Sequence, residues 1–413
     1  MKAGIGRLRR QQRGTFLVAS GLSTAGSFAG LTAKGWILLH GSGSPLLLAL
    51  HFAALALPSL LVSGPAGVAT DRLGCERVLI RAQWGLFAGG SLGALAIPLL
   101  HGQTQVVLLL LSTLLVGVAS TFELTARNKY CALLVDHPEE LAPYLTSFSV
   151  VFNVGKLVGP PLGGWLLALA GPAMALAIDA ATYLIPIGTV VWVLRPRGER
   201  EQRSTGGAAA SLGTAWRECG PVLRHVLRFT ALACLVGFFH PGLAPLIAAK
   251  LLGPSPQELG LFTSVLAAGS VSGGLVLQRH SRGLCRRPAL LLGGCAVLTA
   301  LSQLGMALAL VWPLGPARTV LALAMTFLIG AGTASLLAGT NLIGQVGAPL
   351  VLRGRMAGLG QIAFLGGGGL SGMMAAGLTM RYGLLSCFAL LGLAGLAMGL
   401  WELRQGRMRL EPA

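Results

Sequence analysis

Long apolar runs separated by short basic clusters constrain this chain more than any other feature. A helix that crosses a lipid bilayer needs about 20 mostly apolar residues, and the sequence contains twelve such runs. We therefore predict an all-α, polytopic membrane protein with twelve transmembrane helices. The predicted helices cover residues 15–39, 46–69, 78–100, 105–124, 145–169, 173–194, 224–249, 258–278, 288–312, 318–340, 356–379 and 382–402.

The composition excludes other classes of protein. Charged residues make up 11% of the 413 residues, against about 25% in a soluble domain, and the mean hydropathy is +0.74. Too few charges remain to cover a soluble surface, which excludes a soluble enzyme, a disordered chain and a disulfide scaffold. The net charge is +18, but the basic residues lie between apolar runs. We therefore expect membrane lipids, and no nucleic acid, as partners.

The distribution of basic residues predicts the orientation. Of the 31 Lys and Arg residues, 26 lie in segments on one predicted side of the membrane. The opposite side has only Lys250, Arg318 and Arg381, and two lysines, Lys34 and Lys156, fall inside apolar runs. Basic residues concentrate in cytoplasmic segments of membrane proteins. We therefore predict a multi-pass protein of the inner or plasma membrane with both termini in the cytoplasm.

A polar stretch at residues 195–223 divides the chain. It contains RPRGEREQRSTGG, whose charge and Gly/Ser content are typical of a flexible linker. We predict a cytoplasmic linker between two six-helix bundles, residues 1–194 and 224–413. Duplicated bundles are typical of secondary transporters, with the substrate path between the halves. Shifting the first half by 213 residues pairs Asn128 with Asn341, Gly155 with Gly368, Gly159 with Gly372, and Gly164 with Gly377.

The segment after the second apolar run carries the first motif. It reads GPAGVATDRLGCER from Gly64 and resembles the GxxxDRxGR signature of the major facilitator superfamily. An ordinary basic loop is the alternative. The resemblance implies a close helix approach at Gly67 and an Asp71 that caps a helix or pairs with a basic residue as a latch. Cys75 and Glu76 stand where the superfamily has basic residues. The motif residues are Gly67, Asp71, Arg72, Gly74 and Arg77, and the arginines are expected at the anionic interface.

The fifth apolar run carries the second motif. It reads GKLVGPPLGG from Gly155 and is similar to the GxxxGPxxGG motif of facilitator exporters. Glycines four residues apart form a flat helix face that lets backbones approach, and Pro160 bends the helix. The resemblance implies that this face meets the second half and seals a gate, and plain helix packing is the alternative. The motif residues are Gly155, Gly159, Pro160, Gly163 and Gly164.

Shorter stretches resemble one branch of the superfamily, which contains the enterobactin exporter and macrolide efflux proteins. They are Ser44-Pro45, Phe122 to Arg127, Ile178 to Ala180, and Arg353 to Arg355. Their order along nearly the whole chain supports the resemblance. Ser27 stands where that branch often has an aspartate in the first helix. This chain therefore lacks that one family carboxylate, which could carry protons.

Ionisable residues inside apolar runs are functional candidates. A charge at the bilayer centre costs at least about 2.5–3.5 kcal/mol. We expect Lys156 to contact substrate or to couple transport. Asp179 is expected to be mainly structural, paired with Lys34 or otherwise protonated, and Glu123 to pair with Arg127 one turn later. The substrate or coupling candidates are Lys156, His240, Asp179, Lys34 and Glu123, although His240 could be a hydrogen-bonded helix residue.

Signatures of other activities are missing from the sequence. It has no GxxxxGK[ST], HExxH or GxSxG pattern, and its seven cysteines form no CxxC pair. We therefore expect no enzyme activity, cofactor or metal. The resemblance implies a monomeric secondary active transporter that works by alternating access and exports amphipathic small molecules such as drugs, siderophores or lipids, with protons as a coupling ion. A facilitator-type importer, a lipid transporter, a membrane-embedded enzyme and a non-transporting scaffold are the alternatives.

Overall fold

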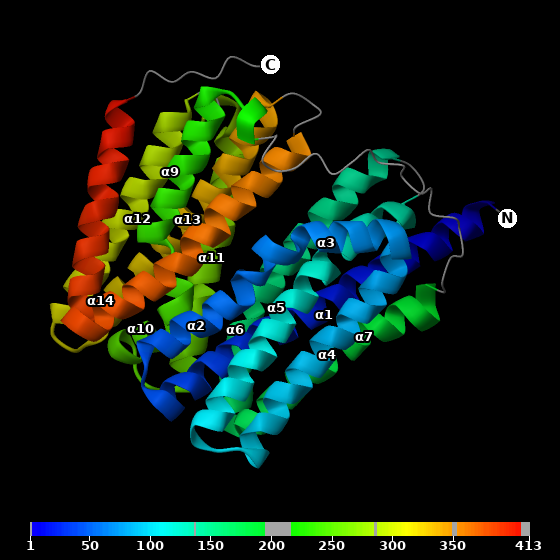
Figure 1. The fold of residues 1–413 in the computed structure, drawn as a ribbon, viewed down its shortest axis with the longest axis horizontal. Coiled ribbons are helices and arrows are strands. Elements are labelled where there is room, and N and C mark those ends of the chain that lie inside the picture. The colour runs from blue at the N-terminus through cyan, green and yellow to red at the C-terminus, as the bar shows by residue number, and fades with distance from the viewer. Residues whose placement is uncertain (1, 136–137, 195–215, 285–286, 349–352, 406–413) are drawn as a thin grey trace. The chain divides into compact units, whose positions relative to one another are not determined.

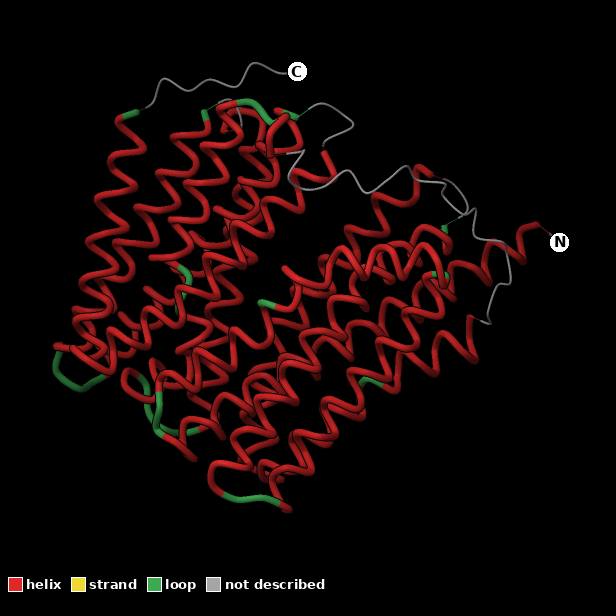
Figure 2. The backbone as a smooth tube through the Cα atoms, viewed as in Figure 1, coloured by secondary structure: helices red, strands yellow, loops and turns green. Residues whose placement is uncertain are grey.

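Helices form all the regular structure of the described chain, which confirms the predicted all-α class (Figures 1 and 2). The structure is a computed structural model that describes residues 2–135, 138–194, 216–284, 287–348 and 353–405. Most of the predicted linker, residues 195–215, and Ser204 within it, lies outside the described residues.

The first half of the chain contains six long or medium helices and a short helical end. The elements are α1 (Lys2–Ser42), α2 (Pro45–Ala56), α3 (Pro58–Leu73), α4 (Cys75–Leu99), α5 (Gly102–Leu134), α6 (Pro138–Thr182), α7 (Leu184–Gly188) and the π-helix η1 (Thr189–Leu194).

The second half follows a similar plan. Its elements are α9 (Pro221–Gly237), α10 (His240–Leu251), α11 (Pro256–Leu284), α12 (Pro288–Val311), α13 (Pro316–Gly347) and α14 (Arg353–Arg404). Proline stands at the first or second position of α9, α12 and α13, where its missing N–H group costs no helical hydrogen bond.

Nine helical stretches of the described chain are long and apolar enough to cross a membrane. Two of them, residues 150–192 and 358–404, are broken at Gly171 and Gly383, where φ is +79° and +84°. Glycine tolerates this left-handed conformation, which other residues rarely adopt. Helix α4 adds 25 helical residues outside these nine stretches. The described helices thus accommodate the twelve predicted crossings, and the count itself stays a prediction.

Two predicted helices are interrupted. Residues 46–69 form α2 and α3, which meet at Leu57 in front of Pro58, and residues 224–249 form α9 and α10, which meet at Phe238 and Phe239. Both breaks lie beside a proline, Pro58 or Pro241, which has no N–H group to continue the helical hydrogen bonds. Residues 45–73 and 221–251 nevertheless each remain one stretch long and apolar enough to cross a membrane, in agreement with the predicted spans.

The described chain forms two compact units. Unit 1 comprises residues 1–43, 54–206 and 255–264, and unit 2 comprises residues 44–53, 207–254 and 265–413. Each unit therefore includes a short segment from the other half of the sequence. The division into bundles 1–194 and 224–413 stays a prediction.

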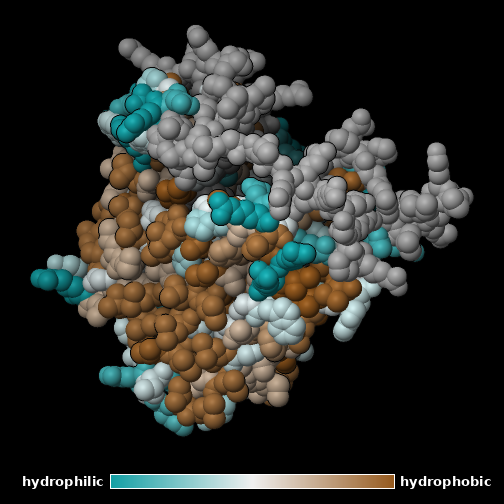
Figure 3. Space-filling model, turned by 45° about the vertical axis from the view of Figure 1, so that its right-hand side comes forward, coloured by the Kyte–Doolittle hydropathy of each residue, from teal (hydrophilic) through white to brown (hydrophobic). Residues whose placement is uncertain are grey.

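An aromatic cluster lies in the hydrophobic core of unit 1. The Phe16 ring lies 5.3 Å from Tyr130 and 5.5 Å from Phe148, and the Tyr144 ring lies 5.3 Å from Phe148. On the surface of the described chain many large apolar side chains are exposed, among them Trp84, Trp165, Leu61 and Leu314. Apolar residues cover much of the face in Figure 3. An exposed apolar surface of this extent is typical of helices that contact lipid.

Candidate functional site

The first motif surrounds the turn between α3 and α4. Gly74 forms the turn, with φ at +89°. Asp71 was expected either to cap a helix or to pair with a basic residue, and it forms a pair. Its Oδ1 accepts a hydrogen bond from Lys129 Nζ of α5 at 2.9 Å. Arg72 and Arg77 are exposed. No atom lies within 4 Å of a Cβ built on Gly67, so the expected close approach is not present in this conformation.

Glu76 lies beside this turn, just ahead of the predicted third span. It is partly buried, and burial raises the pKa of its carboxyl while the Arg77 guanidinium lowers it. Its Oε1 atom has no hydrogen-bond partner. The motif therefore carries a carboxyl with a raised pKa where the superfamily has a basic side chain.

The glycine face of α6 packs against α1. A Cβ on Gly155 would lie 2.9 Å from Thr24 Cγ2, one on Gly159 would lie 2.5 Å from the Ala25 carbonyl oxygen, and one on Gly163 would lie 2.8 Å from Ala29 Cα. Real Cβ atoms do not approach this closely, so these glycines permit backbone contact. In this conformation Gly159 and Gly163 contact α1, and their expected packing on the second half in another state stays a prediction.

The remaining part of the second motif packs against the start of α11, which belongs to unit 1. A Cβ on Gly164 would lie 3.2 Å from Gln257 Cα, and one on Gly260 would lie 2.9 Å from the Pro160 carbonyl oxygen. Ser264 Oγ donates a hydrogen bond to the Leu157 carbonyl at 2.8 Å. Gly164 and Pro160, rather than the main glycine face, therefore contact sequence from the second half.

Lys34 and Asp179 are both buried in unit 1. Lys34 Nζ donates a hydrogen bond to Ser112 Oγ of α5 at 2.7 Å. Both residues are described, and no ion pair joins them. One carboxylate oxygen of Asp179, Oδ1, has no hydrogen-bond partner. The structure therefore places the two groups in one region without the direct pair that the sequence suggested.

Glu123 forms the predicted pair with Arg127 on α5. The Arg127 guanidinium donates to Glu123 Oε1 at 3.0 Å. Gln83 Nε2 of α4 lies 3.5 Å from the same oxygen. An i,i+4 pair with a further amide contact neutralises this carboxylate locally, which favours a structural role.

The other two candidates are separate from this cluster. Lys156 is partly buried on α6, next to the glycine face. His240, at the start of α10 in unit 2, is buried, and both ring nitrogens lack a hydrogen-bond partner. Its ring stacks on Phe239 with centroids 4.1 Å apart and lies 5.7 Å from the Phe388 ring. The role of His240 stays a prediction.

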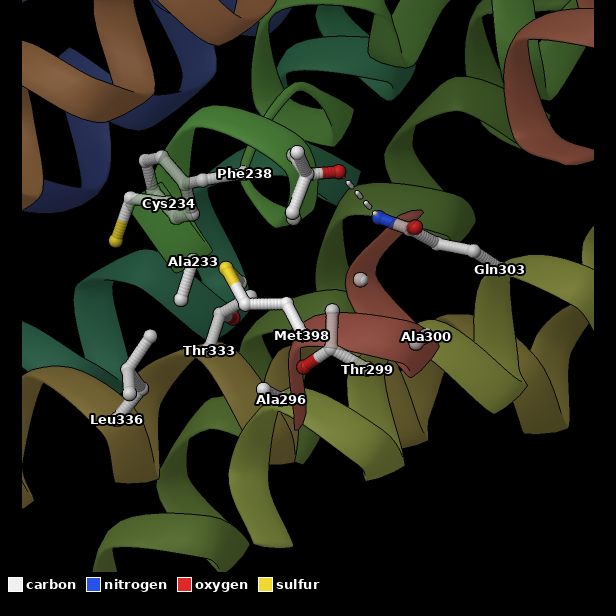
Figure 4. Close-up of a pocket in the computed structure, with 13 residues that line it drawn as sticks. Ala233, Cys234, Phe238, Ala296, Thr299, Ala300, Gln303, Thr333, Leu336 and Met398 are labelled. Atoms are coloured by element: carbon white, nitrogen blue, oxygen red, sulfur yellow. Dashed lines mark hydrogen bonds between the residues drawn. The ribbon is translucent and has the colours of Figure 1, made fainter. Parts of the chain in front are cut away.

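A small pocket in unit 2 lies at the break between α9 and α10 (Figure 4). Its cavity volume is about 10 Å³, which is room for about one water molecule. Gln303 Nε2 of α12 donates to the Val236 carbonyl at 3.2 Å, where the broken helix leaves carbonyls without a donor. Most of the other lining side chains are apolar, and the hydroxyls come from Thr299 and Thr333.

Sequence reasoning missed two of these features. Gln303 was not a candidate, although Pro241 and the preceding Gly237 signal a helix break whose carbonyls need donors. Glu402 was also missed. It is buried near the end of α14, and its two oxygens lie 3.1 and 2.9 Å from Nε2 of His225 on α9. It stands at the last position of the predicted span 382–402, where a charged residue is expected at the membrane surface and gives no sign of burial.

The described residues hold no group of three or more His, Cys, Asp or Glu side chains that could bind a metal ion. Their chemistry consists of helix contacts through glycine and of buried polar groups that form hydrogen bonds. Such an arrangement suits a change of conformation better than bond breaking.

Comparison with known proteins gives consistent results. A model of the family described as transmembrane secretion effector matches residues 3–412. The multidrug efflux pump Tap of Mycolicibacterium fortuitum is 28% identical over 407 residues, covering 94% of each chain. Tap of Mycobacterium tuberculosis (strain ATCC 25618 / H37Rv) is 24% identical over 420 residues, covering 97% of this chain and 96% of that protein.

Solved transporters share the fold. The nucleoside transporter NupG has a TM-score of 0.69 at 12% identity, covering 96% of this chain and 100% of that one. A bacterial homologue of the iron transporter ferroportin, in an inward-facing state, has a TM-score of 0.73 at 16% identity, covering 95% and 98%. At these identities the likeness concerns the fold alone, and it confirms the predicted transporter architecture.

Proposed function

This chain belongs to the transmembrane secretion effector family of the major facilitator superfamily, and we propose that it exports drug-like, amphipathic small molecules by alternating access. The observation that carries the proposal is its relationship to the Tap multidrug efflux pumps along nearly the whole of both chains.

The two motifs supply the contacts that such a cycle would make and break. The Asp71–Lys129 pair joins α3 to α5 near the turn, and the glycine face of α6 lies directly on α1. A salt bridge at a partly exposed surface is weak, of the order of 0–1 kcal/mol. It can therefore hold one conformation without preventing the other.

Reconstitution tests the proposed export. The purified protein, in liposomes of defined orientation, is expected to move labelled amphipathic cations, macrolides or siderophores faster than empty liposomes do. Labelled phospholipid analogues in the same assay test the lipid alternative. Flux equal to the protein-free leak for every compound would contradict the proposal, and a Gly159→Leu variant that inserts normally controls for nonspecific leak.

We also infer that the DRxG turn, both termini and residues 195–223 face the cytoplasm of the cell that carries this multi-pass protein. The excess of basic residues on that side supports this orientation. A cysteine introduced at Ser204 is expected to resist impermeant thiol reagents in intact cells, and one at Gln103 to react. Equal labelling of the two would contradict the orientation.

A further inference from the structure

We propose that Lys34 is the moving part of a proton-controlled switch in unit 1, held by Ser112 when Asp179 is protonated and drawn to Asp179 when that carboxyl is ionised. The inference rests on the proposed export and names its coupling ion and coupling residues. The structure corresponds to the protonated state, because Lys34 lies on Ser112.

The Asp179 carboxyl lies in a tight, dry position. Asp179 is 4% exposed, and its side chain fits against α1 only because residue 30 is glycine: a Cβ there would overlap the carboxylate. Oδ1 has no hydrogen-bond partner. A buried carboxylate with one unpartnered oxygen is costly as an anion, so it binds a proton or gains a cation.

Lys34 forms its hydrogen bond with Ser112 and not with Asp179. Its Nζ donates to Ser112 Oγ at 2.7 Å, and Ser112 Oγ in turn donates to the Gly89 carbonyl at 2.7 Å. Gly93 makes room for the ammonium, since a Cβ there would lie 3.3 Å from Nζ. This site between α4 and α5 satisfies the ammonium with a neutral oxygen, and it leaves the carboxyl of Asp179 without its cation.

The charged and titratable groups around Asp179 are few. From α1 it faces Lys34, and one turn along its own helix it interacts with the Tyr183 hydroxyl, which lies 3.0 Å from Ser27 Oγ. Glu123 of α5 lies beyond Tyr183 and is already paired with Arg127. Lys34 is therefore the cation available to an ionised Asp179 among the described groups that it faces.

Moving Lys34 would change how α1 is held. On Ser112 the lysine ties α1 to α5, and on Asp179 it would tie α1 to α6. The same helix carries Ala25 and Ala29, against which Gly159 and Gly163 of α6 pack. Release of a proton from Asp179 would therefore favour a different position of α1 along the glycine face, which links the proton to the gate motif. The proton comes from and returns to water, and no bond other than O–H changes.

Proteoliposome transport separates the two proposals. Downhill flux without a pH gradient tests export, and substrate-driven proton movement, measured with a pH-sensitive dye, tests the switch. Asp179→Asn is expected to keep downhill flux and to lose proton movement at least tenfold. Lys156→Ala, the rival coupling residue, is expected to keep proton movement. The reverse pattern of the two variants would overturn the switch while leaving export intact.

Ser112→Ala gives a second, quantitative test. Without Ser112, Lys34 pairs more readily with the ionised carboxyl, so protonation needs a lower pH. A hydrogen bond to a charged group is strong enough to move the midpoint of the transport pH profile down by about one pH unit. Ser302→Ala in unit 2, which removes a buried hydroxyl bonded only to a backbone carbonyl, is the matched control and is expected to leave the midpoint unchanged.

Infrared spectroscopy reads the same group if no transported compound is found or if Asp179→Asn folds poorly. Wild-type protein titrated in detergent is expected to show a protonated carboxyl band that disappears as pH rises, with a midpoint lowered by about one pH unit in Ser112→Ala. A midpoint unchanged in Ser112→Ala would overturn the proposal. A band that persists in full in a folded Asp179→Asn variant would do the same.

Discussion

Unit 1 and unit 2 follow a similar helical plan but bury different chemistry. Unit 1 encloses charged groups, Lys34, Asp179 and Glu123, deep among its helices. Unit 2 buries the carboxyl of Glu402 beside His225, and its other side-chain hydrogen bonds are mostly neutral, for example between the hydroxyls of Thr230 and Thr340 at 2.7 Å. A buried charge costs far more than a buried hydroxyl, so the interior of unit 1 carries the larger cost of burial.

The two units also differ in how closely other helices approach their glycine faces. Gly159 contacts the backbone of α1, whereas the position that the repeat pairs with it, Gly372, has its nearest neighbour, Ala49, at 3.8 Å from a built Cβ. A side chain fits at one position and not at the other. The predicted repeat thus pairs two glycines whose surroundings differ.

The largest expected effect concerns the His225–Glu402 hydrogen bond of unit 2. His225→Ala leaves the buried carboxyl of Glu402 without its partner, and a buried polar group that loses its partner costs at least about 1–3 kcal/mol. We expect that loss in the free energy of unfolding, measured by denaturation in detergent. His280→Ala, which removes an exposed ring, is the control. An equal, small loss for both variants would mean that unit 2 does not depend on its buried charge.

The next effect tests the two glycine faces. Gly159→Ala forces α1 and α6 apart and is expected to cost about 1–3 kcal/mol, with most transport lost. Gly372→Ala places a methyl group at ordinary contact distance and is expected to retain stability and transport. Both are measured by unfolding in detergent and by flux in liposomes. Equal sensitivity at the two positions would remove the asymmetry between the units.

The smallest effect concerns the neutral interior of unit 2. Thr340→Val removes the hydroxyl that contacts Thr230, and a hydrogen bond between membrane helices is worth about 0.6 kcal/mol. Thr326→Val, which removes a hydroxyl bonded only to the Ala322 carbonyl, is the matched variant. A loss for Thr340→Val several times larger than this would show that unit 2 also relies on a strong buried polar contact.

The sequence predicted the fold better than the contacts within it. Long apolar runs identify helices because the bilayer sets their length, and the Glu123–Arg127 pair follows from helical spacing alone. The spacing of the glycines in α6 could not predict which helix packs on them. A flat glycine face indicates only that the backbone of some other helix can approach it. Gln303 and Glu402 find their partners 67 and 177 residues away along the chain, and only the fold brings these together. Lys34 pairs with Ser112 because a hydroxyl at the right depth competes with a more distant carboxylate.

The two glycines that break α6 and α14 have a consequence for experiment. At Gly171 and Gly383 the chain reverses at a single left-handed residue, without a polar loop between the helices. A reporter domain or epitope inserted there would have to open the turn rather than extend a loop. Topology mapping by insertion is therefore expected to lose the protein at these two positions instead of reporting on which side of the bilayer they lie. Tags belong at the chain ends.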